Sequence, residues 1–426
     1  MTSLKIPAID IASNHKGFPP TAIGSPAKDL AGRLRLLQEE LPTPVLLLKK
    51  SVFENNLEAM RQFCNQNDLF LSPHAKTAMS PEIASAQLDY GAWGLTVATS
   101  TQAITLRNLG ANRILLANEL MDSHGVNWLS AEMDKHPSFY CYCYVDSPEN
   151  IEMMTEVLRA SKAQRKFPVI IEVGVGRGRA GTRTIDEAAL LARQVEQSNE
   201  LELVGVGGFE GVINGEPGKQ LVADVRGYLV HLRDAADRIW GLYPKKDGRF
   251  IVTVGGSVFI ELIADTFDMQ WRSGRPIDVV MRSGCYVTHD SSAYQRFREY
   301  LATQYRTVPL AASLELWSRV LSRPEPDLAI LDFGKRDTGS DAGFPVPVHR
   351  VRRGTKDLSQ PPGGQVVALN DQHAYFRSDP SSPLDLEVGD KVAFGISHPC
   401  TTLDKWRLFP MVDDSYSVVG TLQTMF

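Results

Sequence analysis

The chain has 426 residues, of which 43% are hydrophobic and 22% charged, and its formal net charge is -5. These values are ordinary for a globular enzyme with one large domain or two smaller ones. The sequence contains no Lys- and Arg-rich block, which argues against nucleic acid or an anionic membrane as a partner. Small molecules are therefore the favoured ligands.

No apolar stretch approaches bilayer length, and residues 1–7 are not followed by the apolar core of a signal peptide, so we expect a cytoplasmic protein. The cysteines form no CxxC pair and no disulfide framework, and they should be reduced. They are Cys64, Cys141, Cys143, Cys285 and Cys400.

The first 43 residues predict an extension with one helix over 27–40, which we expect to pack on a β domain. Residues 45–48 then predict a buried strand. Ser51 followed by Glu54 predicts a capping box that opens a helix ending near Cys64.

From residue 69 onward, apolar runs alternate with helical patterns. Strands are predicted at 69–72, 95–99, 114–118, 139–145, 169–175, 203–209, 250–254 and 278–282. Helices are predicted between them at 80–90, 101–109, 147–161, 185–197 and 219–242. Eight strands with intervening helices predict a (βα)8 TIM-type barrel over residues 44–300.

Beyond about residue 300 the alternation stops, and short strands separated by Pro- and Gly-rich turns predict an all-β domain over 301–426. Its expected strands are 314–320, 328–332, 365–369, 391–395 and 417–423. The stretch 337–364 is expected to be an exposed linker and loop.

Barrel enzymes place their chemistry where the strands end at the C-terminal side. Lys76 lies just past the first of these strands, beside His74 and before a helix signalled by Ser80 and Pro81. A lysine there is either a solvated loop residue or a partly desolvated amine that forms a Schiff base.

Residues 255–257 read Gly-Gly-Ser and lie between the seventh strand and a helical pattern. Such a turn suits a phosphate group, although a plain turn is the alternative, and its place on strand seven favours the phosphate. Gly284 and Cys285 after the eighth strand could supply the other half of a cradle. Arg282 either points to a ring nitrogen or pairs with a carboxylate.

Residues 172–181 are glycine-rich and include Arg177 and Arg179, but they do not form a dinucleotide fingerprint. An arginine held there could bond a phenolate or carboxylate, and the alternative is a flexible loop. His398 and Cys400 lie two apart and would face the same side of an extended chain, offering the two donor types that zinc accepts. The roles of His289, Asp337, Asp341 and His373 stay open.

Several separated motifs agree in order and resemble the fold-type III pyridoxal phosphate (PLP) enzymes, within them the D-serine dehydratase and D-threonine aldolase branch. The resemblance extends from about residue 40 to the C-terminus. The motifs are Thr43-Pro44 and residues 73–77, 91–99, 114–118, 255–257, 282–286 and 398–402.

The resemblance implies an alanine racemase-like barrel, a C-terminal β domain that the strand 45–48 joins, a homodimer and a D-amino acid substrate. It implies that Lys76 holds PLP covalently, that Arg179 lies near the phenolic oxygen and that Arg282 faces the pyridine nitrogen. His398 and Cys400 would bind zinc. The remaining residues implied at the cofactor are His74, Phe209, Gly255, Gly256, Ser257, Gly284 and Cys285.

Two departures from the family pattern matter. D-threonine aldolases carry a carboxylate where this chain has Cys400, which favours a dehydratase, and Phe209 stands where a tyrosine is frequent. The sequence thus predicts a PLP- and zinc-dependent elimination of water from a D-3-hydroxyamino acid, D-serine first, to a 2-keto acid and ammonia. The alternatives are retro-aldol cleavage of D-threonine or D-3-hydroxyaspartate, an amino acid racemase and a silent PLP-binding protein.

Overall fold

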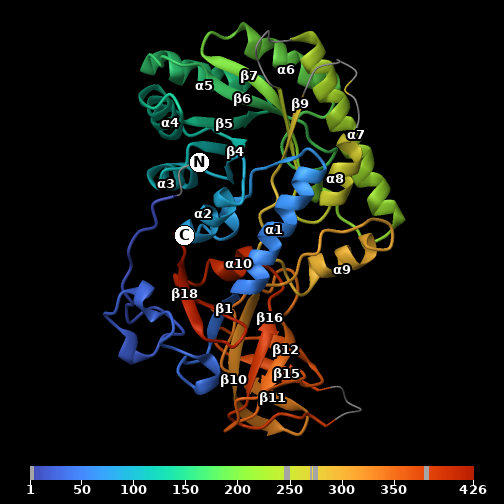
Figure 1. Ribbon diagram of the computed structural model, residues 1–426. Coiled ribbons are helices and arrows are strands. Elements are labelled where there is room, and N and C mark those ends of the chain that lie inside the picture. The colour runs from blue at the N-terminus through green and yellow to red at the C-terminus, as the bar shows by residue number, and fades with distance from the viewer. Residues whose placement is uncertain (1–3, 244–249, 269–270, 272–276, 379–382) are drawn as a thin grey trace.

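A computed structural model describes residues 4–243, 250–268, 271, 277–378 and 383–426. Figure 1 shows an upper barrel wrapped by helices and a lower layer of strands from the C-terminal part of the chain. The predicted fold class is confirmed, because the first sheet has eight parallel strands and the second is almost wholly antiparallel.

The barrel strands lie in the order β2-β9-β8-β7-β6-β5-β4-β3. Hydrogen bonds from Trp93 N to Leu71 O and from Thr96 N to Pro73 O join the two end strands and close the ring. The strands are β2 (Phe70–Leu71), β3 (Leu95–Val97), β4 (Arg113–Glu119), β5 (Tyr140–Val145), β6 (Phe167–Glu172), β7 (Leu201–Gly207), β8 (Phe250–Val254) and β9 (Ile277–Met281).

Side-chain caps fix where most of the outer helices begin. Thr184 forms a capping box with Glu187, whereas the capping box predicted at Ser51 is wrong, because the Ser51 hydroxyl bonds to Asp414 instead. The helices are α1 (Lys50–Gln66), α2 (Pro81–Asp89), α3 (Ser100–Asn108), α4 (Ser123–Lys135), α5 (Pro148–Ser161), α6 (Ile185–Gln197), α7 (Lys219–Leu242), α8 (Ile260–Phe267) and α9 (Ala293–Leu301).

The second sheet has the order β13-β12-β16-β10-β1-β17-β18, with β11, β15 and β14 attached through β10. Its strand β1 precedes the barrel strands in the sequence and pairs with β10 and β17. The strands are β1 (Val45–Lys49), β10 (Leu314–Glu325), β11 (Leu328–Leu331), β12 (Val346–Val351), β13 (Leu358–Ser359), β14 (Gln365–Leu369), β15 (Ala374–Arg377), β16 (Lys391–Gly395), β17 (Leu408–Val412) and β18 (Val418–Gln423).

The expectation of an exposed linker over 337–364 holds for residues 353–358, which are exposed, but is wrong for the part before them. This stretch contains β12, which pairs with β16, and Asp337 is buried. Between β16 and β17 the chain forms the short helix α10 (Cys400–Leu403). Figure 1 shows α10 between the barrel and the second sheet.

The helix expected over 27–40 is also wrong, and short 3-10 turns stand in its place: η1 (Pro20–Ala22), η2 (Ala27–Leu30) and η3 (Leu36–Gln38). Positive φ angles at Gly32 and Glu39 interrupt any continuous helix. The backbone instead bonds to the second sheet, from Gly32 N to Val418 O and from Leu36 N to Tyr416 O. Within the described residues, no helix is long and apolar enough to cross a membrane.

Candidate active site

A pocket of about 200 Å³ opens where the barrel strands end and α10 faces them. Every residue that the sequence predicted at the site lines this pocket. Those residues are His74, Lys76, Arg179, Phe209, Gly255, Gly256, Ser257, Arg282, Gly284, Cys285, His398 and Cys400. Further lining residues are Thr77, Ala98, Ala117, Asn118 and Tyr294.

Lys76 sits on the 3-10 turn η4 (Ala75–Thr77), which directly follows β2. Its neighbours Ala75 and Thr77 are buried, while Lys76 itself is exposed at the pocket. A hydrogen bond from Met79 N to Ala75 O and the packing of α10 against the turn hold the backbone. The turn is therefore fixed and its amine is free to react.

His74 precedes the turn and has a neutral ring. Burial lowers its pKa well below the usual value, and the positive charges of Lys76 and Arg282 lower it further. Its Nδ1 is a buried atom for which the described residues provide no hydrogen-bond partner. A neutral imidazole with one nitrogen free of hydrogen bonds in the pocket wall suits contact with an aromatic ligand that carries polar groups.

The Ser257 hydroxyl joins the loops that follow β8 and β9. It accepts hydrogen bonds from Cys285 N at 3.0 Å and from the Ser283 hydroxyl at 3.0 Å. Because a hydroxyl has two lone pairs and one hydrogen, its own hydrogen remains available for a ligand anion. The arrangement gives the predicted cradle a donor in a fixed position.

Two glycines of the cradle are required by geometry. Gly255 has φ +107°, and a Cβ at Gly284 would lie 2.6 Å from His74 O. Gly284 thus lets the β9 loop touch the lysine turn. The Gly256 N–H, in contrast, already donates to the buried Glu210 carboxyl at 2.8 Å.

The two arginines differ in how firmly they are held. Arg282 is 3% exposed and donates to the Thr253 hydroxyl at 2.8 Å and to Gly208 O at 2.6 Å. Among the described carboxylates none forms an ion pair with it. Arg179 is exposed, and its guanidinium lies 5.2 Å from the centre of the Phe209 ring.

A carboxyl pair lies beside these arginines. Burial raises the pKa of Glu172 to about 9, and a hydrogen bond with Glu119 adds to the effect. Glu172 ends β6 and Glu119 ends β4, so the barrel geometry brings them together. At neutral pH Glu172 therefore keeps its proton.

His398 and Cys400 face the pocket, although the chain there is not extended as predicted. Pro399 has helical angles and Cys400 begins α10. His398 Nδ1 donates to Asp341 at 2.6 Å, and Thr401 donates to the other oxygen of Asp341 at 2.6 Å. This carboxylate fixes the imidazole and leaves its other nitrogen toward Cys400.

The thiol and the imidazole of this pair stabilise each other's charged forms. Hydrogen bonds with Cys285 and His398 lower the pKa of Cys400, while the hydrogen bond with Cys400 raises the pKa of His398 to about 9. A thiolate and a ring nitrogen held by an outer carboxylate are donors that zinc accepts. In the part of the chain described, no group of three or more His, Cys, Asp or Glu residues is arranged to hold a metal ion.

The sequence carried no signal for Tyr294, and it left the role of Asp341 open and that of Glu119 unassigned. Tyr294 lies on α9, a short helix without a recognisable cap, and hydrogen-bonds with Cys285. Asp341 and Glu119 are distant in sequence from their partners, and only the folded sheet order reveals the contact. The other lining residues, Thr77, Ala98, Ala117 and Asn118, all belong to the sequence motifs 73–77, 91–99 and 114–118.

Two family profiles match the chain: "Alanine racemase, N-terminal domain" over residues 49–245 and "Putative serine dehydratase domain" over residues 313–412. The chain belongs to the fold-type III PLP family that contains the D-serine dehydratases and D-threonine aldolases. This agrees with the barrel and the second sheet described above.

Individual relatives cover most of the chain. A D-threonine aldolase from Arthrobacter sp is 27% identical over 80% of this chain and 81% of its own length. The crystal structure of D-threonine aldolase from Filomicrobium marinum has a TM-score of 0.72 at 21% identity, covering 92% of this chain and 98% of the other. D-threo-3-hydroxyaspartate dehydratase from Delftia sp. HT23 has a TM-score of 0.69 at 20% identity, covering 92% and 99%.

Proposed function

We propose that this protein is a PLP- and zinc-dependent lyase that eliminates water from a D-3-hydroxyamino acid, D-serine first, to give a 2-keto acid and ammonia. The observation that carries the proposal is one pocket that contains the lysine turn, an anion cradle and the His398–Cys400 pair. The family relationship supports a PLP-dependent lyase of D-amino acids.

The His-x-Cys spacing favours the dehydratase over the aldolase. Two related structures are of D-threo-3-hydroxyaspartate dehydratase variants in which a histidine, or a cysteine two positions further on, is replaced by alanine. The cysteine variant is described as metal-free. His398 and Cys400 have the same spacing, which supports a metal-assisted dehydratase here.

PLP would supply an electron sink for the carbanion formed at Cα. Lys76 would hold it covalently, the Ser257 hydroxyl and the Gly284–Cys285 loop would bind its phosphate, and Arg179 would bond its phenolic oxygen. The fit rests on the free hydrogen of Ser257 and on Gly284, whose missing Cβ lets the β9 loop contact the lysine turn. With PLP bound, the Lys76 amine would be the base that takes the Cα proton of the substrate.

Arg282 sets the strength of this electron sink. Its guanidinium is held by Thr253 and Gly208, so it would face a cofactor ring nitrogen as a fixed hydrogen-bond donor that does not readily give up its proton. Charge developing on a departing hydroxide therefore needs separate help. Zinc at His398 and Cys400 would supply Lewis-acid chemistry there, a contribution of several kcal/mol.

A product assay over D-serine, D-threonine and D-threo-3-hydroxyaspartate tests the proposal. We expect a keto acid and ammonia, loss of turnover with a chelator, and recovery on adding zinc. Glycine and an aldehyde as products would overturn the dehydratase in favour of the aldolase. Lys76→Ala should abolish turnover and the visible absorbance of bound PLP, whereas Lys162→Ala on the barrel surface should change neither.

We also propose a homodimer in which the second sheet of one subunit approaches the barrel opening of the other. The exposure of Lys76 and Arg179 in the single chain supports a further covering surface. Sedimentation velocity of the purified chain tests this, and a monomer at working concentration would contradict it.

A further inference from the structure

Two cysteine sulfur atoms from different parts of the fold meet in the wall of the pocket. Cys285 Sγ, from the loop after β9, lies 3.6 Å from Cys400 Sγ, at the start of α10. The Thr77 hydroxyl contacts both, at 3.7 Å from Cys285 and 3.6 Å from Cys400. The pair therefore spans the gap between the barrel and the second sheet, directly beside the lysine turn.

We propose that Cys285 and Cys400 are a modification site, a dithiol that small-molecule disulfides such as oxidised glutathione convert to an intramolecular disulfide. A disulfide bond is about 2.05 Å long, so the sulfur atoms must approach by about 1.5 Å. We expect rotation of the Cys400 side chain, at the start of α10, to provide this movement without a change in the sheet order. The cross-link itself does not depend on the proposed function.

The small-molecule disulfide is the oxidant of this reaction. One cysteine sulfur attacks a sulfur of the small disulfide and releases one small thiol, leaving a mixed disulfide on the protein. The second cysteine sulfur then attacks the modified cysteine and releases the other small thiol. Both cysteines are oxidised, the small disulfide is reduced, and the two thiol protons leave with the two small thiols.

The surroundings make the site selective. Cys400 is half-buried at the pocket, so an oxidant reaches it first, and buried Cys285 is the resolving thiol. The other cysteines, Cys64, Cys141 and Cys143, are buried in the barrel core. Three of the five thiols should therefore remain reduced in the folded protein.

The cross-link would have two consequences that do rest on the proposed function. It removes the Cys400 sulfur from the zinc site, and it ties the phosphate-binding loop to α10. The disulfide and the metal would then exclude each other, and a reductant would restore zinc binding.

The test treats the purified full-length chain with oxidised glutathione and counts thiols after denaturation. We expect five thiols to fall to three, a mass lower by two hydrogen atoms, and a proteolytic peptide pair joined through Cys285 and Cys400. Cys64→Ala, as the matched control, should give the same cross-link. Cys285→Ser should stop at a glutathione adduct on Cys400.

Unchanged thiols, a stable glutathione adduct on the wild-type chain, or a cross-link between other cysteines would each overturn the proposal. Wild-type peptide mapping decides this even if a variant fails to fold. A second experiment adds zinc before the oxidant. Slower cross-linking would then support the view that zinc and the disulfide use the same Cys400 sulfur. If zinc leaves the rate of cross-linking unchanged, the result contradicts the assignment of zinc to Cys400 but supports the dithiol site.

Discussion

At the scale of single residues, the buried carboxyl of Glu172, beside Glu119, sets a pH dependence of stability. The pKa of Glu172 is raised from 4.5 to about 9, so the folded chain keeps a proton that the unfolded chain releases. Stability from this group is present in full below about pH 4.5 and is lost as pH rises toward 9. The variant Glu172→Gln should remove this slope in the free energy of unfolding, measured by urea titration at several pH values.

Glu196→Gln on the exposed surface of α6 is the control and should leave the pH profile unchanged. If the free energies of unfolding of Glu172→Gln and the wild type change in parallel from acid to alkaline pH, Glu172 does not hold a proton in the folded chain.

The carboxylate behind His398 gives a second test at this scale. Asp341 accepts the Nδ1 proton of His398, which fixes the tautomer that can bind a metal. Asp341→Asn should weaken zinc binding about 10- to 100-fold, measured by competition with a fluorescent chelator. Asp371→Asn, at an exposed position, should leave zinc affinity unchanged, and equal affinities for all three proteins would rule out the orienting role.

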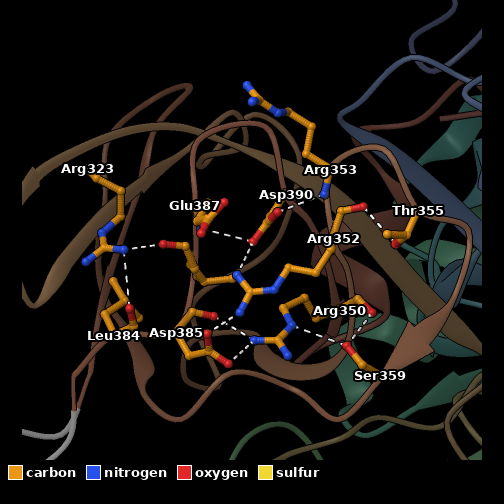
Figure 2. A network of polar contacts seen from close by, with 11 residues as sticks. Arg323, Arg350, Arg352, Arg353, Thr355, Ser359, Leu384, Asp385, Glu387 and Asp390 are labelled. Carbon is orange, nitrogen blue, oxygen red and sulfur yellow. Dashed lines mark hydrogen bonds and ion pairs between the residues drawn. The ribbon is translucent and has the colours of Figure 1, made fainter.

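At the scale of elements, the arginines expected in an exposed linker belong instead to a structural network around β12 (Figure 2). Arg352 donates to Asp390 at 2.9 Å, and Asp390 also accepts from Arg353 N and Glu387 N. Asp390 is fully buried, while Asp385, a second partner of Arg352, is mostly exposed. The network ties the loop before β16 to β12.

The two acidic partners should therefore differ in their effect on stability. Asp390→Ala leaves three donors without their acceptor and should lower the free energy of unfolding by about 2–3 kcal/mol. Asp385→Ala removes exposed ion pairs and should cost about 0–1 kcal/mol. Urea unfolding of both variants provides the comparison, and similar losses would contradict the argument from burial.

The sequence predicts an element well where periodicity and a boundary signal agree. The bounds of α6, α7, β8, β14 and β16 were correct to the residue. The helix over 27–40 failed because its apolar residues face β1 and β18, and long-range backbone bonds replaced the helical ones. Strands β12 and β17 were missed because each contains a proline that weakens the strand pattern.

At the scale of the whole molecule, the pocket depends on both sheets being docked. One continuous core includes barrel residues and residues of β1, β10 and β16. The C-terminal end also reaches the barrel, where Met425 N donates to Met79 O and Gln423 bonds to Glu82. Sequence motifs identified the residues of the pocket, but only this docking brings His398 and Cys400 to the lysine turn.

Asn56 on α1 is the buried polar group at this junction. Its side chain donates to Val287 O at 3.0 Å and to Ala311 O at 2.7 Å, and it accepts from Ala311 N at 3.0 Å. Asn56→Asp keeps the shape but turns a carboxylate toward two carbonyls in a site with no solvent exposure. We expect a loss of roughly 3–5 kcal/mol in the free energy of unfolding at neutral pH. The loss should shrink in acid, because burial raises the pKa of the new carboxyl and protonation restores one donor.

Asn65→Asp, on the exposed face of the same helix, should cost less than about 0.5 kcal/mol in the same urea titrations. Equal losses for the two variants would show that this junction does not hold the sheets together.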